Sequence, residues 1–167
     1  MNEVYDFLVK ESGIKYKDTI VAAVSGGPDS MALLHILNKV KKEMDLFLIC
    51  AHVNHNVRIE ESEQERKDLQ KYCEDNAIHF EYMKIEHYGD DNFHNEARSI
   101  RYKYFEKIVK DYGAKFLFTA HHADDLMETI LMRIVRGSSL KGYSGFSKIV
   151  DKHDYKIIRP FVTVTKD

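Results

Sequence analysis

The stretch TIVAAVSGGPDSMALLHIL, residues 19–37, decides how the rest of the chain is arranged. Its first six residues are apolar and partly β-branched, which is typical of a strand buried in a parallel sheet. Its last seven residues continue as an apolar helix. A buried strand that enters a helix through a glycine-rich turn predicts an anion site. Glycine lets the backbone approach a ligand closely, and free N–H groups at the helix start point toward it.

The turn itself reads SGGPDS, residues 25–30. Two glycines alone would suit an ordinary turn with a serine cap, but the full string between a strand and a helix favours a phosphate site. It lacks the Gly-Lys-Ser/Thr of a Walker A loop and the G-x-G-x-x-G of a dinucleotide fold. The residues expected to hold nucleotide phosphates are Ser25, Gly26, Gly27, Pro28, Asp29 and Ser30.

Composition narrows the class of protein. The chain has 167 residues, of which 44% are hydrophobic and 31% charged, as expected for one soluble globular domain. No apolar run approaches the roughly 20 residues of a membrane span, and the polar first residues predict no signal peptide. The net charge of −2 excludes a uniformly basic nucleic-acid binder, so RNA contacts would need a local patch.

The two cysteines, Cys50 and Cys73, form no C-x-x-C pattern. They predict neither a disulfide framework nor a cysteine metal site, and a reducing cytoplasm is the expected location. Both fall in apolar positions of predicted elements, so we expect them to be buried.

Strand and helix patterns alternate along the chain, which predicts an α/β, Rossmann-like open parallel sheet of about five strands with helices on both faces. The predicted strands are 19–24, 45–53, 79–85, 115–120 and 155–161. The predicted helices are 4–10, 28–42, 60–76, 96–112 and 124–135, with a polar loop at 90–95. Residues 1–167 form one expected domain, whose ligands should lie beyond the carboxyl ends of the strands.

Two further polar clusters follow predicted strands, as that rule requires. His52 and Asn54 end the second strand and are predicted to bind the nucleotide. The string HHADDLMET, residues 121–129, follows the fourth strand. In it Asp125 and Glu128 share a helix face, and carboxylates beside a triphosphate usually hold Mg²⁺, so Asp125 and Asp29 are the expected metal ligands. A helix cap at Asp124 and a zinc site with the two histidines are the alternatives.

Arginines recur at a spacing of three residues in two predicted helices. The pairs are Arg98 with Arg101 and Arg133 with Arg136. Each pair alone would usually be a solvated face. Together they predict a local surface for the phosphates of ATP or RNA.

The SGGxDS loop resembles the pyrophosphate loop of the ATP pyrophosphatases. The chain as a whole resembles the tRNA(Ile)-lysidine synthetases, a family with motifs in the same order. The matching strings are SGGPDS at 25–30, HVNHNVR at 52–58, ARSIRY at 97–102, DLMET at 125–129, RIVRG at 133–137 and IRP at 158–160. Ser139 and Tyr143 stand where the family commonly has glycine and leucine.

This resemblance implies a PP-loop ATPase domain and a reaction. Such enzymes use ATP to adenylate C2 of the wobble cytidine in a CAU-anticodon isoleucine tRNA, and free L-lysine then displaces AMP through its ε-amine. The resemblance implies charge stabilisation by His121, His122 and Arg159, and attraction of the lysine ammonium by Glu128. A carboxylate or histidine should accept the proton that lysine loses, and the sequence leaves its identity open.

Family members usually continue into further domains that grip tRNA. The chain stops soon after residues 158–160, so we expect it to comprise the catalytic domain without those C-terminal domains, either as a cut piece or as a short natural form. The oligomeric state stays open, with a homodimer as one option. The rival interpretations are a PP-loop tRNA thiolase and an ATP-binding module without turnover.

Overall fold

The computed structural model describes residues 2–55, 58–86, 93–121, 135 and 147–162. The helix predicted for 124–135 lies outside this part of the chain, apart from Val135. Among the described helices, none is both long and apolar enough to cross a bilayer.

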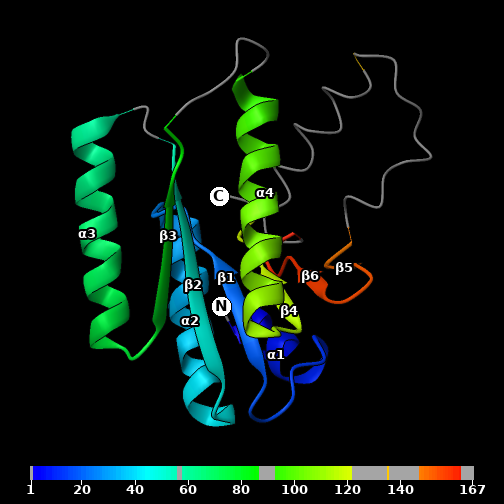
Figure 1. The fold of residues 1–167 in the computed structure, drawn as a ribbon. Coiled ribbons are helices and arrows are strands. Elements are labelled where there is room, and N and C mark those ends of the chain that lie inside the picture. Colours follow the sequence, from blue (N-terminus) through cyan, green and yellow to red (C-terminus); the bar gives the residue numbers. More distant parts are fainter. Residues whose placement is uncertain (1, 56–57, 87–92, 122–134, 136–146, 163–167) are drawn as a thin grey trace.

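One twisted sheet organises the described residues (Figure 1). Its strands are β1 (Thr19–Ala23), β2 (Phe47–Asn54), β3 (His79–Lys84), β4 (Phe116–Phe118), β5 (Ile149–Asp151) and β6 (Lys156–Ile158). Their order across the sheet is β3-β2-β1-β4-β6-β5. Every neighbouring pair is parallel except β5 and β6, which are antiparallel. The predicted α/β class with a mainly parallel sheet is confirmed.

Helices cover both faces of this sheet. They are α1 (Asn2–Lys10), α2 (Pro28–Met44), α3 (Ile59–Asp75) and α4 (Phe93–Tyr112). Successive strand residues point to opposite faces, so β1 supplies both cores. Ile20 and Ala22 pack in the core that contains residues of α1, α2 and α3, whereas Val21 packs in the core built with α4. Figure 1 shows α4 in front of the sheet.

Several elements differ from the sequence prediction, and the physical reasons for three of these differences are clear. Asp45 adopts a left-handed conformation (φ 52°) and caps α2 through its N–H, so β2 begins at Phe47 and not at residue 45. Residues 93–95, predicted as loop, are the first turn of α4. The strand β5 was not predicted, and the described sheet therefore has six strands where about five were expected. As a three-residue edge strand, β5 is too short to show a strand period.

The order of the strands locates the ligand crevice. From β1 the chain proceeds to β2 and β3 on one side, and then returns to place β4 on the other side of β1. A doubly wound sheet binds ligands beyond the carboxyl ends of the strands at such a reversal. Here that position lies between residues 24–30, which follow β1, and residues 119–121, which follow β4.

Candidate functional site

The loop after β1 is held by hydrogen bonds between its own hydroxyl and backbone groups. The Ser25 and Ser30 hydroxyls are 3.1 Å apart, and Ser30 Oγ also donates to the Gly27 carbonyl at 3.0 Å. The N–H groups of Gly26 and Gly27 donate to the hydroxyl oxygens of Ser30 and Ser25, at 3.2 and 3.3 Å. Pro28 then opens α2. The loop therefore presents two hydroxyls and two N–H groups at a helix N-terminus.

The two glycines of the loop have different roles. Gly26 has φ +96°, a conformation that side chains rarely adopt, and a Cβ there would lie 3.6 Å from the Glu65 carboxylate. Gly27 has an ordinary φ of −71°, and a Cβ there would meet only Ser25 Oγ, at 3.5 Å. The fold therefore requires glycine at 26, while at 27 it leaves open space on the loop surface.

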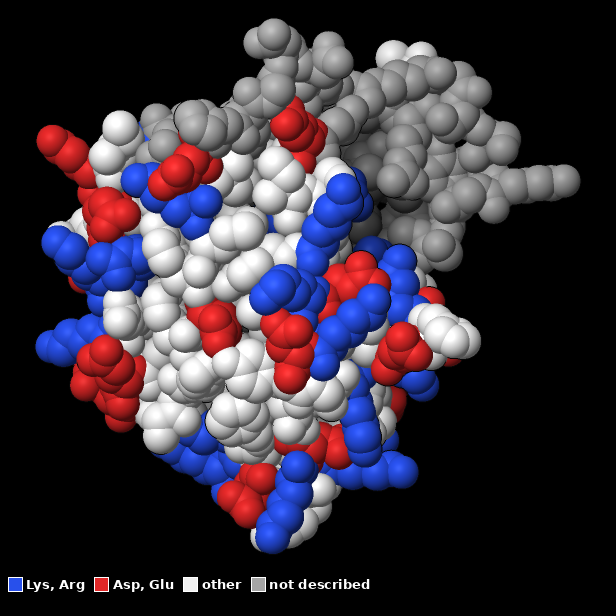
Figure 2. Space-filling model, in the orientation of Figure 1, with Lys and Arg blue, Asp and Glu red and all other residues white. Residues whose placement is uncertain are grey.

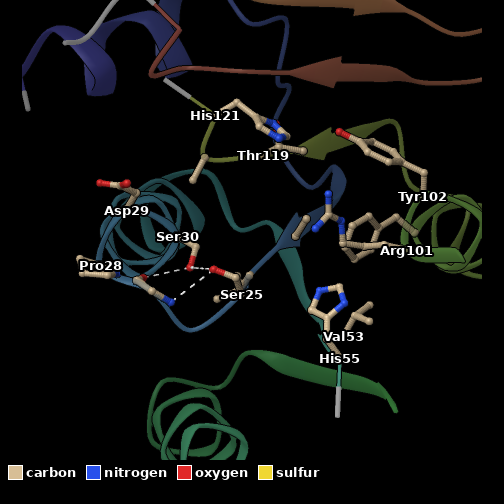
Figure 3. Close-up of a pocket in the computed structure, with 15 residues that line it drawn as sticks. Ser25, Pro28, Asp29, Ser30, Val53, His55, Arg101, Tyr102, Thr119 and His121 are labelled. Atoms are coloured by element: carbon tan, nitrogen blue, oxygen red, sulfur yellow. Dashed lines mark hydrogen bonds between the residues drawn. The ribbon is translucent and has the colours of Figure 1, made fainter. Parts of the chain in front are cut away.

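A cavity of about 260 Å³ lies at the predicted reversal of the sheet (Figure 3). Five residues of the predicted phosphate loop line it, namely Ser25, Gly27, Pro28, Asp29 and Ser30. Apolar side chains form another part of its wall, among them Ala23, Val53, Phe105 and Ala120. Polar groups thus meet an apolar surface in one hollow, the usual composition of a small-molecule site.

Arg101 and His55 lie across the cavity from the loop serines, as Figure 3 shows. Arg101 comes from α4, and burial lowers the pKa of its guanidinium, which nevertheless stays protonated at neutral pH. The pKa of His55 is lowered by burial first, and then by the nearby charges of Arg101 and His52. This side of the cavity therefore combines a fixed positive charge with a mainly neutral imidazole.

The segment after β4 closes the cavity. Thr119 Oγ1 and His121 Nδ1 are 2.9 Å apart, and either can donate in that hydrogen bond. Both residues line the cavity, as does Tyr102 of α4 (Figure 3). The histidine predicted from the second polar cluster is therefore in the same hollow as the phosphate loop.

His52 and Asn54, predicted to bind the nucleotide, do not line this cavity. The buried His52 ring donates from Nδ1 to the Val24 carbonyl at 2.8 Å and stacks on Tyr82. Burial lowers the pKa of His52, against weaker opposing effects of the Val24 carbonyl and Glu65. The Asn54 amide donates to the Tyr82 hydroxyl at 3.1 Å. Both line a smaller hollow of about 190 Å³ on the α3 side of the β2 end.

The remaining predicted residues fall into two sets. Arg98 and Arg159 line a separate groove between α4 and the β5–β6 hairpin. The others lie outside the described residues, and these are His122, Asp125, Glu128, Arg133 and Arg136.

Several residues of the cavity were not predicted as site residues, among them His55, Tyr102, Phe105 and Thr119. The alternation of side chains along β2 could have predicted His55. Residues 53 and 55 share one face of the strand, and His52 lies on the opposite face. The sequence gives no comparable indication for Phe105, because its apolar position in the helix predicts only that it is buried.

A Rossmann-like sheet with a glycine-rich loop at its reversal point defines a class, the α/β domains that bind a phosphorylated ligand beyond their strand ends. Within this class, the chain belongs to the PP-loop domain family, whose model matches residues 2–167.

Several curated relatives are described as tRNA(Ile)-lysidine synthase. The protein of Bacillus cereus (strain ATCC 14579) is 40% identical over 100% of this chain, and that of Clostridium acetobutylicum is 37% identical over 99%. The protein of Streptococcus thermophilus (strain CNRZ 1066) is 42% identical over 89% of the chain. The chain spans about a third of each relative, between 34% and 36% of its length.

Among solved structures, the fold resembles the U34-tRNA thiolase NcsA from Methanococcus maripaludis, described with its [4Fe-4S] cluster. The TM-score is 0.79 at 20% sequence identity, over 98% of this chain and 57% of the thiolase. This likeness supports the PP-loop fold.

Proposed function

We propose that this domain binds ATP in the cavity between β1 and β4 and is the catalytic part of a tRNA(Ile)-lysidine synthase. One observation carries the proposal: the SGGPDS loop lies at the reversal point of the sheet, in a chain 37–42% identical to lysidine synthases of three genera. The proposed reaction joins free L-lysine to C2 of the wobble cytidine in a CAU-anticodon isoleucine tRNA.

The polar and apolar parts of the cavity wall suggest how ATP is oriented in this proposal. The phosphates are proposed to lie against the loop at the start of α2, where the helix dipole favours anions. There the Ser25 and Ser30 hydroxyls and the Gly27 N–H, which bond to groups of the loop itself in this structure, would donate to phosphate oxygens instead. The adenine ring lies on the apolar wall that Ala23, Val53 and Phe105 form. Arg101 faces the loop from α4 and can balance part of the phosphate charge.

Mg²⁺ is proposed to bind Asp29 and Asp125 together with phosphate oxygens. Asp29 fits this role, because its carboxylate is the hard oxygen ligand that Mg²⁺ prefers and it lines the cavity in the first turn of α2. No group of three His, Cys, Asp or Glu side chains suited to a metal occurs among the described residues. When bound, the ion would neutralise charge on the departing pyrophosphate.

In the first proposed step the C2 oxygen of cytidine attacks the α-phosphorus of ATP, and pyrophosphate leaves. In the second step the ε-amine of lysine attacks C2, loses a proton, and AMP leaves. His121, His122 and Arg159 are proposed to stabilise the developing charge, and Glu128 to attract the lysine ammonium. His55 joins the candidates for accepting the proton, because its lowered pKa favours the neutral imidazole.

Arg98, Arg101, Arg133 and Arg136 are proposed to contact phosphates of ATP or RNA. The reaction is proposed to take place in the cytoplasm. A homodimer is one proposed oligomeric state of the enzyme. Further domains that contact tRNA are proposed for the whole enzyme, as in the family.

A thiolase of the same superfamily is the second candidate, favoured by the likeness to the NcsA fold. Thiolases of this kind usually carry pairs of cysteines that take part in the reaction. The only two cysteines of the chain, Cys50 in β2 and Cys73 in α3, are both buried in the core, as expected from the sequence. Their positions favour lysidine synthesis over sulfur transfer.

The products formed from ATP test the proposal. The chain is incubated with radiolabelled ATP, CAU-anticodon isoleucine tRNA and L-lysine, and the nucleotides are separated. Release of pyrophosphate that depends on tRNA, together with release of AMP that depends on both tRNA and lysine, supports the synthase. Tight ATP binding with no turnover under any condition supports a binding module and would overturn the proposal.

A further inference from the structure

A second hollow, a groove of about 480 Å³, runs between α4 and the β5–β6 hairpin. It is distinct from the nucleotide cavity, but Tyr102 lines both of them. A molecule lying in the groove would therefore reach the proposed ATP site at the Tyr102 ring.

The groove carries more basic than acidic side chains. Arg98, Lys103 and Lys152 line it together with Arg159 and His153, against the carboxylates Glu106 and Asp154. Glu106 is already paired with Lys110, at 3.2 Å. Within the described part of the chain, Lys103 and Lys152 form no ion pair. Figure 2 shows basic and acidic side chains interleaved over α4 and the neighbouring hairpin, in a chain whose net charge is −2.

Tyr102 adds an aromatic surface where the groove meets the cavity. The guanidinium carbons of Arg98 and Arg101 lie 5.7 and 5.8 Å from its ring centroid. Arg98 belongs to the groove and Arg101 to the cavity. Aromatic rings flanked by cations are what proteins use to bind single-stranded RNA, since bases stack on the ring and phosphates contact the cations.

We propose that the groove holds a single-stranded RNA segment next to the nucleotide that is modified, with phosphates on Arg98, Lys103 and Lys152 and a base against Tyr102. This inference rests on the proposed function, because it assumes that an RNA base must reach ATP. An acidic peptide would match the cations but would leave the stacking surface of Tyr102 unused.

The test compares two double variants with equal charge change. Lys103→Glu with Lys152→Glu alters the groove, whereas Lys67→Glu with Lys107→Glu alters exposed lysines of α3 and α4 that do not line it. Binding of a fluorescent anticodon stem–loop RNA with CAU in its loop is measured by anisotropy over a range of low salt concentrations.

The groove variant should bind this RNA about tenfold more weakly than the control variant, with a salt slope smaller by roughly 1.4, since two phosphate contacts are lost. Tyr102→Leu should weaken binding by about tenfold and leave the salt slope unchanged, while Tyr102→Phe should bind normally. Equal RNA affinity of the two double variants would overturn the inference. So would absence of RNA binding by the unmodified chain at low salt, or equally strong competition by a polyglutamate peptide.

Calorimetry with ATP alone separates this inference from the proposed function. The groove variant should keep the ATP affinity of the unmodified chain, because neither lysine lines the nucleotide cavity. If the unmodified chain failed to bind ATP, the proposed function would fall, whereas the RNA comparison would still decide whether the groove binds RNA.

Discussion

At Gly27 the requirements of folding can be separated from those of ligand binding. Its ordinary φ and the space around its Cβ position show that the fold accepts a side chain there. Gly26, with φ +96°, offers no such separation, because any substitution there strains the backbone.

We expect Gly27→Val to weaken ATP binding at least tenfold, or about 1.4 kcal/mol, because the new side chain occupies the surface that phosphate must approach. Folding should lose only about 1 kcal/mol, since valine is a poorer N-cap than glycine. Calorimetric titration with ATP and thermal melting measure the two effects separately. Normal ATP affinity in a folded Gly27→Val chain would show that the phosphates do not lie on this loop.

Asp29 occupies the first turn of α2 and lines the cavity. Asp29→Asn should leave the melting temperature nearly unchanged, and it should reduce pyrophosphate release by at least about 100-fold if the carboxylate stabilises charge in the transition state. Asp68→Asn, an exposed position on α3, is the control. A large loss of stability with activity retained per folded molecule would instead make Asp29 a structural residue.

At the scale of elements, the buried His52 at the end of β2 makes the stability of the fold depend on pH. The hydrogen bond from its Nδ1–H to the Val24 carbonyl connects β2 to the start of the phosphate loop. Burial lowers the pKa of the ring in the folded chain. The unfolded chain, with the ordinary histidine pKa, binds the proton more readily. Protonation therefore favours unfolding as pH falls below the unfolded pKa.

The free energy of unfolding should accordingly decrease between about pH 7 and pH 5, with His52 contributing a slope of up to roughly 1.4 kcal/mol per pH unit. In His52→Gln this part of the slope should disappear. Chemical denaturation at a series of pH values measures it. The same slope in the variant and the unmodified chain would mean that His52 does not control this dependence.

Element patterns explain what the sequence could predict and what it could not. Long periodic segments such as α2 and β2 were placed within about two residues, because many buried positions repeat in them. The strand β5 was missed because three edge residues show no period. Arg98 and Arg101, predicted to share a helix face, line different hollows because α4 separates the groove from the cavity at that turn.

Prediction from the sequence was limited in a similar way for the individual residues of the candidate site. The SGGPDS loop was recognisable because its glycines and hydroxyls have few other uses between a strand and a helix. At the end of β2 the polar residues were correctly located, but the cavity proposed to bind ATP is lined by His55 and not by His52. Which member of such a cluster faces the ligand depends on the pleat of the strand against its neighbours, and composition does not reveal it.

At the scale of the whole molecule, the net charge limits how tightly this domain can bind tRNA by itself. The net charge is −2, and the basic groove on α4 offers only a few phosphate contacts. Few contacts give weak and salt-sensitive RNA binding, because each neutralised phosphate adds to affinity through counterion release. The chain spans only 34–36% of the length of these lysidine synthases, and we propose that the remainder of such an enzyme strengthens its grip on tRNA.

Whether this chain is the catalytic part of a lysidine synthase is best tested by incorporation of radiolabelled lysine into CAU-anticodon isoleucine tRNA, measured together with AMP release at low and physiological salt. We expect ATP-dependent incorporation that matches AMP in amount, small at low salt and nearly lost at physiological salt. Addition of the remaining domains of a lysidine synthase should restore it. AMP release without lysine incorporation at any salt would contradict lysidine synthesis. Full salt-resistant activity of these 167 residues would show that their low net charge does not limit tRNA binding.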